Sequence, residues 1–314
     1  MNGLLAVADL RGDPRRRAHD RRMRRLLGGS ALVTIIVSAL ILFVLARGTF
    51  DFLRSIGWNF GILRDLSEAP GWFPRRERFD LLTIFLGSVI MGMIAMLVAV
   101  PLGLGTAVYL SEFAPTKVRK ILKPIVEVLA GIPSVIVGYF ALKFIAPNIV
   151  NPIFFPGQPP IRNMLVAGLA IGVLVVPIMA SISEDALRAV PSSLREASYG
   201  IGARKSTTTI RIVIPAAVSG IVAAFIIATS RAIGETMVAA MAGGRDGSGP
   251  RTLNPLEPGL TMTAAMTNAA GGTDQVNSGA PFQVLFFVGL LLFLMTMTLN
   301  VIGDRFVQRV RQQY

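Results

Sequence analysis

Long runs without a charged residue constrain the fold of this sequence more than any other feature. Residues 26–46, 81–111, 163–183 and 275–303 each lack Asp, Glu, Lys and Arg. A helix needs about 20 apolar residues to cross the hydrocarbon core of a bilayer, and each run is long enough. The chain is 53% hydrophobic and only 16% charged, whereas soluble domains usually carry about 25% charged residues. The sequence therefore predicts membrane-spanning helices.

Two further segments bring the prediction to six spans. A span near 124–145 contains only Glu127 and Lys143 as charged residues, and a fifth span runs from about 212 to 240. The sixth is placed at 281–303. We therefore expect an all-α membrane protein with six transmembrane helices. Its predicted parts are a basic tail at 1–25, a first anchor helix at 26–46, an external loop at 47–80, a core of five transmembrane helices at 81–303 and a C-terminal tail at 304–314.

Lys and Arg are distributed unequally between the two sets of connecting segments. Residues 1–25, 111–123, 184–211 and 304–314 together hold 20 of the 31 basic residues, and the alternate segments hold 10. Cytoplasmic segments of membrane proteins carry an excess of Lys and Arg. We therefore expect both termini, and the segment at 184–211, to lie in the cytoplasm.

The scarce residue types exclude several kinds of function. The chain has no Cys, which excludes disulfides and thiolate chemistry, and its one His is His19 within an arginine cluster. Zinc hydrolysis and His-based acid–base catalysis therefore have almost no candidate side chains. The net charge of +13 is concentrated at the ends of apolar runs, which favours membrane topology over nucleic-acid binding. We expect no catalytic, cofactor or metal site in this chain.

A polar segment at 187–215, here called the elbow, separates two apolar ones and contains the stretch EASYGIGARKSTTTIRIVIP. Pro191 near a helix start, a helical stretch to Tyr199, and then Gly200 and Gly202 predict a helix–turn–helix that continues into the fifth span. The letters GARKST suggest a phosphate-binding loop. Such a loop needs Gly immediately before Lys-Ser, where this chain has Arg204, and it follows a strand, whereas membrane helices flank this segment. Nucleotide binding by this chain is therefore not expected.

The elbow matches a longer pattern, E-A-A-x3-G-x9-I-x-L-P, with Ser198 and Ile214 replacing an Ala and a Leu. The matching residues are Glu196, Ala197, Gly202, Ile212 and Pro215. This stretch resembles the coupling motif in permease subunits of bacterial ATP-driven (ABC) importers. The resemblance implies the type I importer permease fold. It also implies that these five residues dock into a separate ATPase subunit, which would bind ATP and Mg²⁺.

Two charged residues, Arg231 and Glu235, lie inside the predicted fifth span in the stretch SRAIGETMVAA. A charge near the centre of a transmembrane helix costs about 2.5–3.5 kcal/mol on insertion scales. Residues four apart share a helix face, so the two side chains are expected to meet. One interpretation is an ion pair that only packs the bundle. The other is a substrate path, because guanidinium matches phosphate-like oxyanions and Thr236 adds a neighbouring hydroxyl.

The residues 230–240, together with EVLAGIPSVIVGYFAL and PLGLGTAVYLSEFAP, resemble the permeases of the high-affinity phosphate importer, PstC type more than PstA type. The resemblance covers about 80–310. It implies phosphate uptake across the bacterial cytoplasmic (inner) membrane. It also implies a heterodimer with a second homologous permease, two ATPase subunits and an external phosphate-binding protein. In that family the charged pair, here Arg231 and Glu235, is implicated in phosphate passage.

Other readings of the sequence stay open. The elbow would be unchanged in a permease for sulfate, molybdate or phosphonate, and only the pocket would differ. A secondary transporter or channel would work without an ATPase, and the elbow argues against it. A membrane-bound enzyme is disfavoured because His, Cys and paired carboxylates within the membrane are scarce.

Three local expectations complete the prediction. Five prolines in 141–162 predict an irregular external loop. The stretch GLTMTAAMTNAA within the outer segment 241–280 predicts a short helix near the membrane surface. Glu127 is expected in the first turns of the third span. It could pair with a partner subunit, cap a helix or lie at the membrane interface beside Lys123 at i−4, and the last interpretation is favoured.

Overall fold

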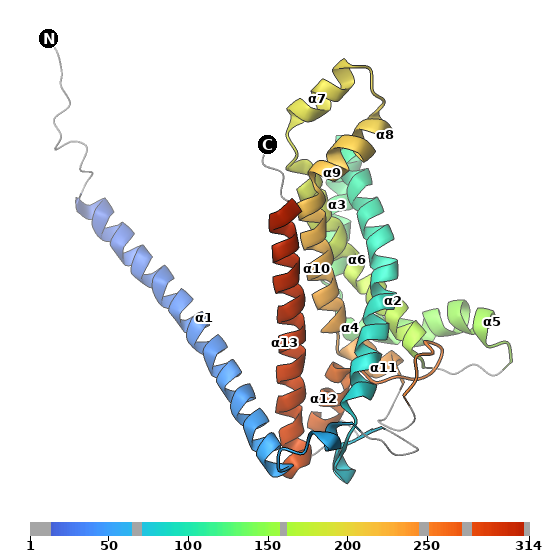
Figure 1. The fold of residues 1–314 in the computed structure, drawn as a ribbon. Coiled ribbons are helices and arrows are strands. Elements are labelled where there is room, and N and C mark those ends of the chain that lie inside the picture. Colours follow the sequence, from blue (N-terminus) through green and yellow to red (C-terminus); the bar gives the residue numbers. More distant parts are fainter. Residues whose placement is uncertain (1–13, 65–70, 158–161, 245–250, 272–277, 311–314) are drawn as a thin grey trace.

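The computed structural model describes residues 14–64, 71–157, 162–244, 251–271 and 278–310. Over these ranges the chain is a bundle of helices with one two-stranded hairpin (Figure 1). Five helices are long and apolar enough to cross a membrane: Arg22–Ser55, Leu81–Phe113, Ser134–Phe154, Met164–Arg188 and Gly279–Arg309. A bent pair, Lys205–Ala216 and Val218–Ile233, is the sixth if it is counted as one span. The predicted six-span helical architecture is therefore confirmed.

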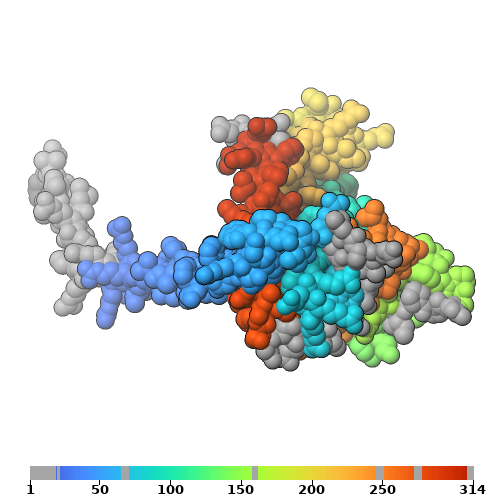
Figure 2. All heavy atoms as spheres, turned by 60° about the horizontal axis from the view of Figure 1, so that its bottom comes forward, coloured from blue at the N-terminus to red at the C-terminus, as the bar shows by residue number. Residues whose placement is uncertain are grey.

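The first helix, α1 (Pro14–Ser55), extends beyond the predicted anchor at 26–46 on both sides. Arg is a good helix former, so the basic sequence before residue 26 continues the helix. The apolar part of α1 projects sideways from the bundle and is exposed along its length (Figures 1 and 2). Near its C-terminal end, buried Phe52 packs on Phe287 of α13 (Gly279–Val310), with ring centroids 5.5 Å apart.

The predicted external loop at 47–80 contains a small folded unit. A 3₁₀ turn, η2 (Phe60–Leu63), precedes the strands β1 (Trp72–Phe73) and β2 (Arg78–Phe79), which pair antiparallel around the turn η3 (Pro74–Arg76). The buried Trp72 lies opposite Phe79, and Phe79 meets Phe52 edge to face. Apolar contacts therefore hold this unit against the C-terminal end of α1.

A buried carboxylate links this region to Arg251, in the segment before α12 (Met262–Gly271). Asp80 is fully buried and directly precedes α2 (Leu81–Val108). Arg251 donates from Nε to Oδ2 at 2.9 Å and from Nη2 to Oδ1 at 2.8 Å. The Thr83 hydroxyl also donates to Asp80 Oδ2. This bidentate geometry is the strong form of an Arg–carboxylate pair.

The centre of the bundle is formed by α2 and α6 (Met164–Arg188), whose close approach depends on small residues. A Cβ on Gly168 would lie 2.6 Å from Ile94 Cβ, and a Cβ on Gly172 would lie 2.8 Å from Val98 Cβ. Glycines four apart on one helix face therefore let the two backbones pack closely. Gly103 fits Met179 in the same way.

The third span differs from its predicted position near 124–145. A separate helix, α3 (Thr116–Ala130), carries Glu127, and the spanning helix begins only at Ser134, after the break at residues 131–133. It then continues through α4 (Ser134–Phe140), the π-helical segment η5 (Ala141–Val150) and α5 (Asn151–Phe154). The irregular loop predicted for 141–162 is therefore wrong over residues 141–154. The widened π-helical geometry of η5 accommodates Pro147, and Pro152 lies in the first turn of α5.

The elbow comprises α7 (Ser192–Gly200), α8 (Lys205–Thr208), the π-helical turn η6 (Thr209–Val213) and α9 (Ile214–Ala216). The predicted helix–turn–helix is present. The fifth span, however, is not one straight helix over 212–240. The axis bends by 69° before α10 (Val218–Ile233), and a second break precedes α11 (Met237–Ala242).

The short helix predicted in GLTMTAAMTNAA is present as α12 (Met262–Gly271). Its residues Met262, Ala264 and Ala265 are buried, so it packs inside the bundle rather than lying on its surface. The Met262 amide donates to Ser88 Oγ of α2 at 2.9 Å. The elbow and the described end of α13 lie at one end of the bundle, whereas α11 and α12 lie toward the other (Figure 1).

Candidate functional site

Arg231 and Glu235 form an ion pair where α10 ends. Arg231 Nη1 lies 2.7 Å from Glu235 Oε2. The helix ends at Ile233, so Glu235 lies in the break rather than on a continuous helix face. The Arg231 side chain is 44% exposed, whereas that of Glu235 is 3% exposed. The pair therefore presents a cation at the subunit surface and keeps its carboxylate inside.

Glu235 is held from several directions. Its Oε1 accepts hydrogen bonds from the amides of Met237 at 3.2 Å and Val238 at 3.5 Å, at the start of α11. Its backbone carbonyl accepts from Thr263 Oγ1 at 2.9 Å. A carboxylate at a helix N-terminus is stabilised by the free amides there. Glu235 is thus a fixed anchor against which the Arg231 side chain is positioned.

Thr236 is the third residue predicted for the substrate path. Its hydroxyl donates to the Gly234 carbonyl at 3.3 Å. It is adjacent to the pair in sequence, but its hydroxyl bonds to the backbone of the break. The structure therefore brings Arg231 and Glu235 together and gives Thr236 a local contact.

The elbow is closed by a contact between its two helical parts. Ser198 Oγ and Thr208 Oγ1 lie 2.8 Å apart, and both residues are buried. Between them Gly202 has φ +81°, a left-handed conformation that favours Gly. The Ala203 amide then donates to the Ser198 carbonyl at 3.1 Å. Ser198, which departs from the Ala of the sequence pattern, thereby supplies a hydrogen bond that Ala cannot make.

The predicted coupling residues differ in exposure. Glu196, Ala197, Gly202 and Pro215 are exposed, whereas Ile212 is half-buried. Ile201, at the tip of the elbow, is 86% exposed and is the apolar residue there with most surface. Ile201 and Glu196 are thus both accessible on the surface of the elbow.

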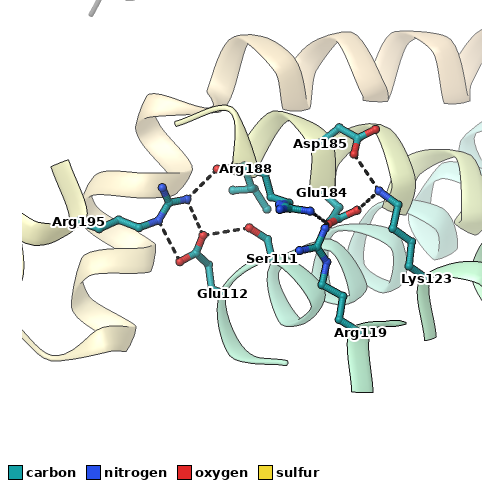
Figure 3. A network of polar contacts seen from close by, with 9 residues as sticks. Ser111, Glu112, Arg119, Lys123, Glu184, Asp185, Arg188 and Arg195 are labelled. Atoms are coloured by element: carbon teal, nitrogen blue, oxygen red, sulfur yellow. Dashed lines mark hydrogen bonds and ion pairs between the residues drawn. The ribbon is translucent and has the colours of Figure 1, made fainter. Parts of the chain in front are cut away.

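A buried carboxylate at the end of α6 anchors α3. Glu184 is 1% exposed and lies 2.7 Å from Arg119 Nη2 and 2.6 Å from Lys123 Nζ (Figure 3). Lys123 also contacts Asp185 at 3.0 Å, and Arg188 Nη1 lies 3.8 Å from Glu184. Lys123 therefore binds carboxylates of α6, and Glu127 lies four residues after it on the same helix, α3.

These contacts perturb the titration of the lysine. The hydrogen bond to Glu184 raises the pKa of Lys123 above its ordinary value of 10.5, and burial opposes this effect. The contact with Asp185 acts in the same direction as Glu184. Lys123 is thus held in its charged form.

A second pair joins the elbow to the end of α2. Arg195 Nη2 lies 2.8 Å from Glu112 Oε1, in the π-helical turn η4 (Tyr109–Phe113) that ends this span. The same guanidinium donates to the carbonyls of Val190 at 2.7 Å and Leu187 at 2.9 Å. Figure 3 shows Arg195 reaching Glu112 from the elbow side.

The sequence prediction did not identify Glu112, Glu184 or Arg195 as site residues. A signal was present, because Glu112 and Glu184 are each the first charged residue after an uncharged run. Both residues therefore lie at the ends of predicted spans, on the side rich in Lys and Arg. Their particular partners lie 61 to 83 positions away in sequence and follow from the packing of α2, α3, α6 and α7.

Comparison with known proteins gives the following matches. Residues 99–313 match the family model "Binding-protein-dependent transport system inner membrane component". The phosphate transport system permease protein PstC of Mesorhizobium japonicum is 32% identical over 90% of this chain and 88% of its own length. PstC of Haemophilus influenzae is 29% identical over 90% of this chain and 91% of its own length.

Solved structures match at lower identity. A bacterial alginate ABC transporter in complex with an alginate-bound periplasmic protein contains a chain with a TM-score of 0.66 and 15% identity, covering 94% of this chain and 98% of that one. A chain of the MetNI methionine ABC transporter in an inward-facing conformation has a TM-score of 0.52 and 20% identity, covering 72% of this chain and 92% of that one. At these identities the matches establish the fold.

Proposed function

The chain belongs to the family of binding-protein-dependent transport system inner membrane components, and on that premise we propose that it is a permease subunit of an ATP-driven phosphate importer. As a family member it is a multi-pass inner-membrane protein and a transport subunit rather than an enzyme. Phosphate as the substrate is supported by its similarity to PstC permeases.

The exposure of the Arg231 side chain is the main structural support for an oxyanion as the substrate. One of its nitrogens binds Glu235, while nearly half of the side chain remains accessible. A guanidinium has five N–H donors in a planar fork and stays charged at working pH. Arg231 therefore has donors left for an anion that passes along this face of the subunit.

The partners belong to the same proposal. A second homologous permease would cover the face that carries Arg231 and complete the translocation path. Two ATPase subunits would bind ATP and Mg²⁺ and receive the elbow through Glu196, Ala197, Gly202, Ile212 and Pro215. An external phosphate-binding protein would deliver the substrate on the opposite side. The exposed apolar tip at Ile201 supports docking of the elbow, and the predicted topology would place both termini in the cytoplasm.

The test is uptake of labelled phosphate by proteoliposomes that hold the reconstituted complex. ATP is enclosed inside, the binding protein is added outside, and sulfate and molybdate serve as competitors. We expect uptake that requires ATP and that the competitors do not block. Uptake of another oxyanion instead of phosphate would overturn the substrate while retaining the permease. Phosphate uptake without ATP would overturn the coupling to an ATPase.

A further inference from the structure

One side chain, that of Arg195, connects the start of the elbow to two other spans. Arg195 lies in the first turn of α7 and is 19% exposed, and Glu112, at the end of α2, is 5% exposed. The guanidinium binds this carboxylate through Nη2 at 2.8 Å and Nε at 3.4 Å. Such a charge-assisted, two-point contact fixes orientation as well as distance.

The same guanidinium also binds the end of α6. Nη1 donates to the Val190 carbonyl at 2.7 Å, and Nη2 donates to the Leu187 carbonyl at 2.9 Å. Carbonyls in the last turn of a helix lack partners within the helix, and a cation near this end is favourable. Arg195 therefore links α7, α2 and α6 in one contact.

An apolar cluster supports this junction. Ala107 of α2, Leu187 and Val190 at the end of α6, Val213 of η6 and Ala217 are buried together. Both parts of the elbow thus meet the ends of α2 and α6 through packed side chains. By contrast, the continuation of the elbow into α10 bends by 69°. The contact of Arg195 with Glu112 and with the carbonyls of Leu187 and Val190 therefore connects α7 to the bundle by a route that does not pass through this bend.

We infer that Arg195 is a positioning residue that transmits displacement of the elbow to α2 and α6 through its contact with Glu112 and the α6 carbonyls. This inference rests on the proposed function, because it requires an ATPase that moves the elbow. It predicts that breaking the Arg195–Glu112 pair separates ATP hydrolysis from transport without removing the ATPase. It does not require Arg195 to touch the ATPase or the substrate.

The first experiment compares Arg195→Ala, Glu112→Ala and the double variant in the reconstituted complex. The readout is the amount of phosphate transported per ATP hydrolysed, with ATPase co-purification measured in parallel. Each single change is expected to lower this ratio about tenfold, within the usual range of coupling between sites. If the residues act through their contact, the double variant falls no further than the single variants. Arg195→Lys, which keeps the charge but loses the fork, should fall between wild type and Arg195→Ala.

Arg188→Ala is the matched control. Arg188 is an arginine of the same network, but its side chain is 50% exposed and its contact with Glu184 is 3.8 Å long. We expect its ratio to match wild type. An unchanged amount of phosphate transported per ATP in Arg195→Ala would overturn the inference. So would a double variant in which the reductions caused by the two single changes multiply. If Arg195→Ala loses bound ATPase, but the complexes that keep it transport a normal amount of phosphate per ATP, Arg195 is a docking residue. That result would also overturn the inference.

A second measurement does not depend on the substrate. Amide hydrogen exchange in the complex should speed up in α7 of Arg195→Ala and stay unchanged in that helix of Arg188→Ala. If wild type takes up no phosphate, the proposed function fails while this comparison still tests the junction. If α7 exchanges at the wild-type rate in Arg195→Ala, the junction does not hold the elbow and the inference fails.

Discussion

Arg231 and Glu235 are joined at 2.7 Å, yet the first side chain is 44% exposed and the second 3% exposed. This asymmetry separates an accessible cation from a buried anchor. In a symmetrical structural pair both groups would be buried, and removal of either would mainly affect stability. The arrangement therefore leads to a prediction in which the two residues differ.

Replacing Arg231 with Ala should abolish phosphate uptake while the subunit still inserts and assembles. Replacing Glu235 with Ala should in addition destabilise the protein, because the amides of Met237 and Val238 lose their acceptor. Uptake in proteoliposomes and thermal unfolding in detergent separate the two effects. Arg231→Lys serves as a charge-conserving control. Uptake that survives in Arg231→Ala would show that the pair is only structural.

The two glycines of the elbow form a matched pair for testing its turn. A Cβ would meet no atom within 4 Å at either Gly200 or Gly202, but only Gly202 has a positive φ, +81°. A non-Gly residue in the left-handed region costs about 1–2 kcal/mol. Gly202→Val should therefore distort the elbow, leave the protein inserted and reduce co-purification of the ATPase and uptake. Gly200→Ala should be nearly neutral. Equal effects of the two changes would contradict the role of the turn.

Breaking the buried pair between Asp80 and Arg251 should be costly. Asp80 is fully buried and the Arg251 side chain is 22% exposed. Removing one partner of a buried ion pair typically costs roughly 3–5 kcal/mol. We expect Asp80→Ala to lower the unfolding free energy of the detergent-solubilised protein by an amount of this order. Asp304→Ala, at an exposed position, is the control. A change in Asp80→Ala no larger than in the control would refute the prediction.

The raised pKa of Lys123 predicts a loss of stability in alkaline solution. Because the folded-state pKa lies above the ordinary value of 10.5, the stabilisation is fully present below that pH and is lost as the pH rises through the folded value. Lys123→Arg keeps its charge throughout this range. The Tm of wild type should therefore fall relative to that of this variant as the pH rises above about 10.5. A constant difference up to strongly alkaline pH would argue against the prediction.

Four of the six spans could be predicted from uncharged runs, and the other two from apolar segments that contain only two charged residues each. The start of the third span could not, because apolar residues of α3 such as Ile121 and Val128 are exposed on a helix outside the span. An exposed apolar face has the same composition as a buried one. The break at residues 131–133 itself contains Gly131 and Pro133, which end helices. The position of α3 on α6, by contrast, depends on the contacts of Arg119 and Lys123 with Glu184, which the local sequence does not encode.

At the candidate site, too, contacts between residues close in sequence could be predicted and contacts between distant ones could not. Arg231 and Glu235 were predicted to meet because they lie four residues apart, and they do. The partner of Arg195 lies 83 positions away, and that of Lys123 lies 61 positions away. Such pairs depend on tertiary packing, so only the presence of charges at span ends could be anticipated. The proposed contacts of Glu196 and Ala197 depend on a partner and remain predictions.

The bend between α9 and α10 sets the direction in which force can reach the fifth span. A movement of Lys205–Ala216 along its own axis meets α10 at 69°, so only about a third of the movement, the cosine of that angle, is directed along α10. The larger component is perpendicular to it. A push from this side would therefore tilt α10 sideways rather than drive it through the bilayer as a piston. Arg231, near the far end of α10, would swing laterally with it.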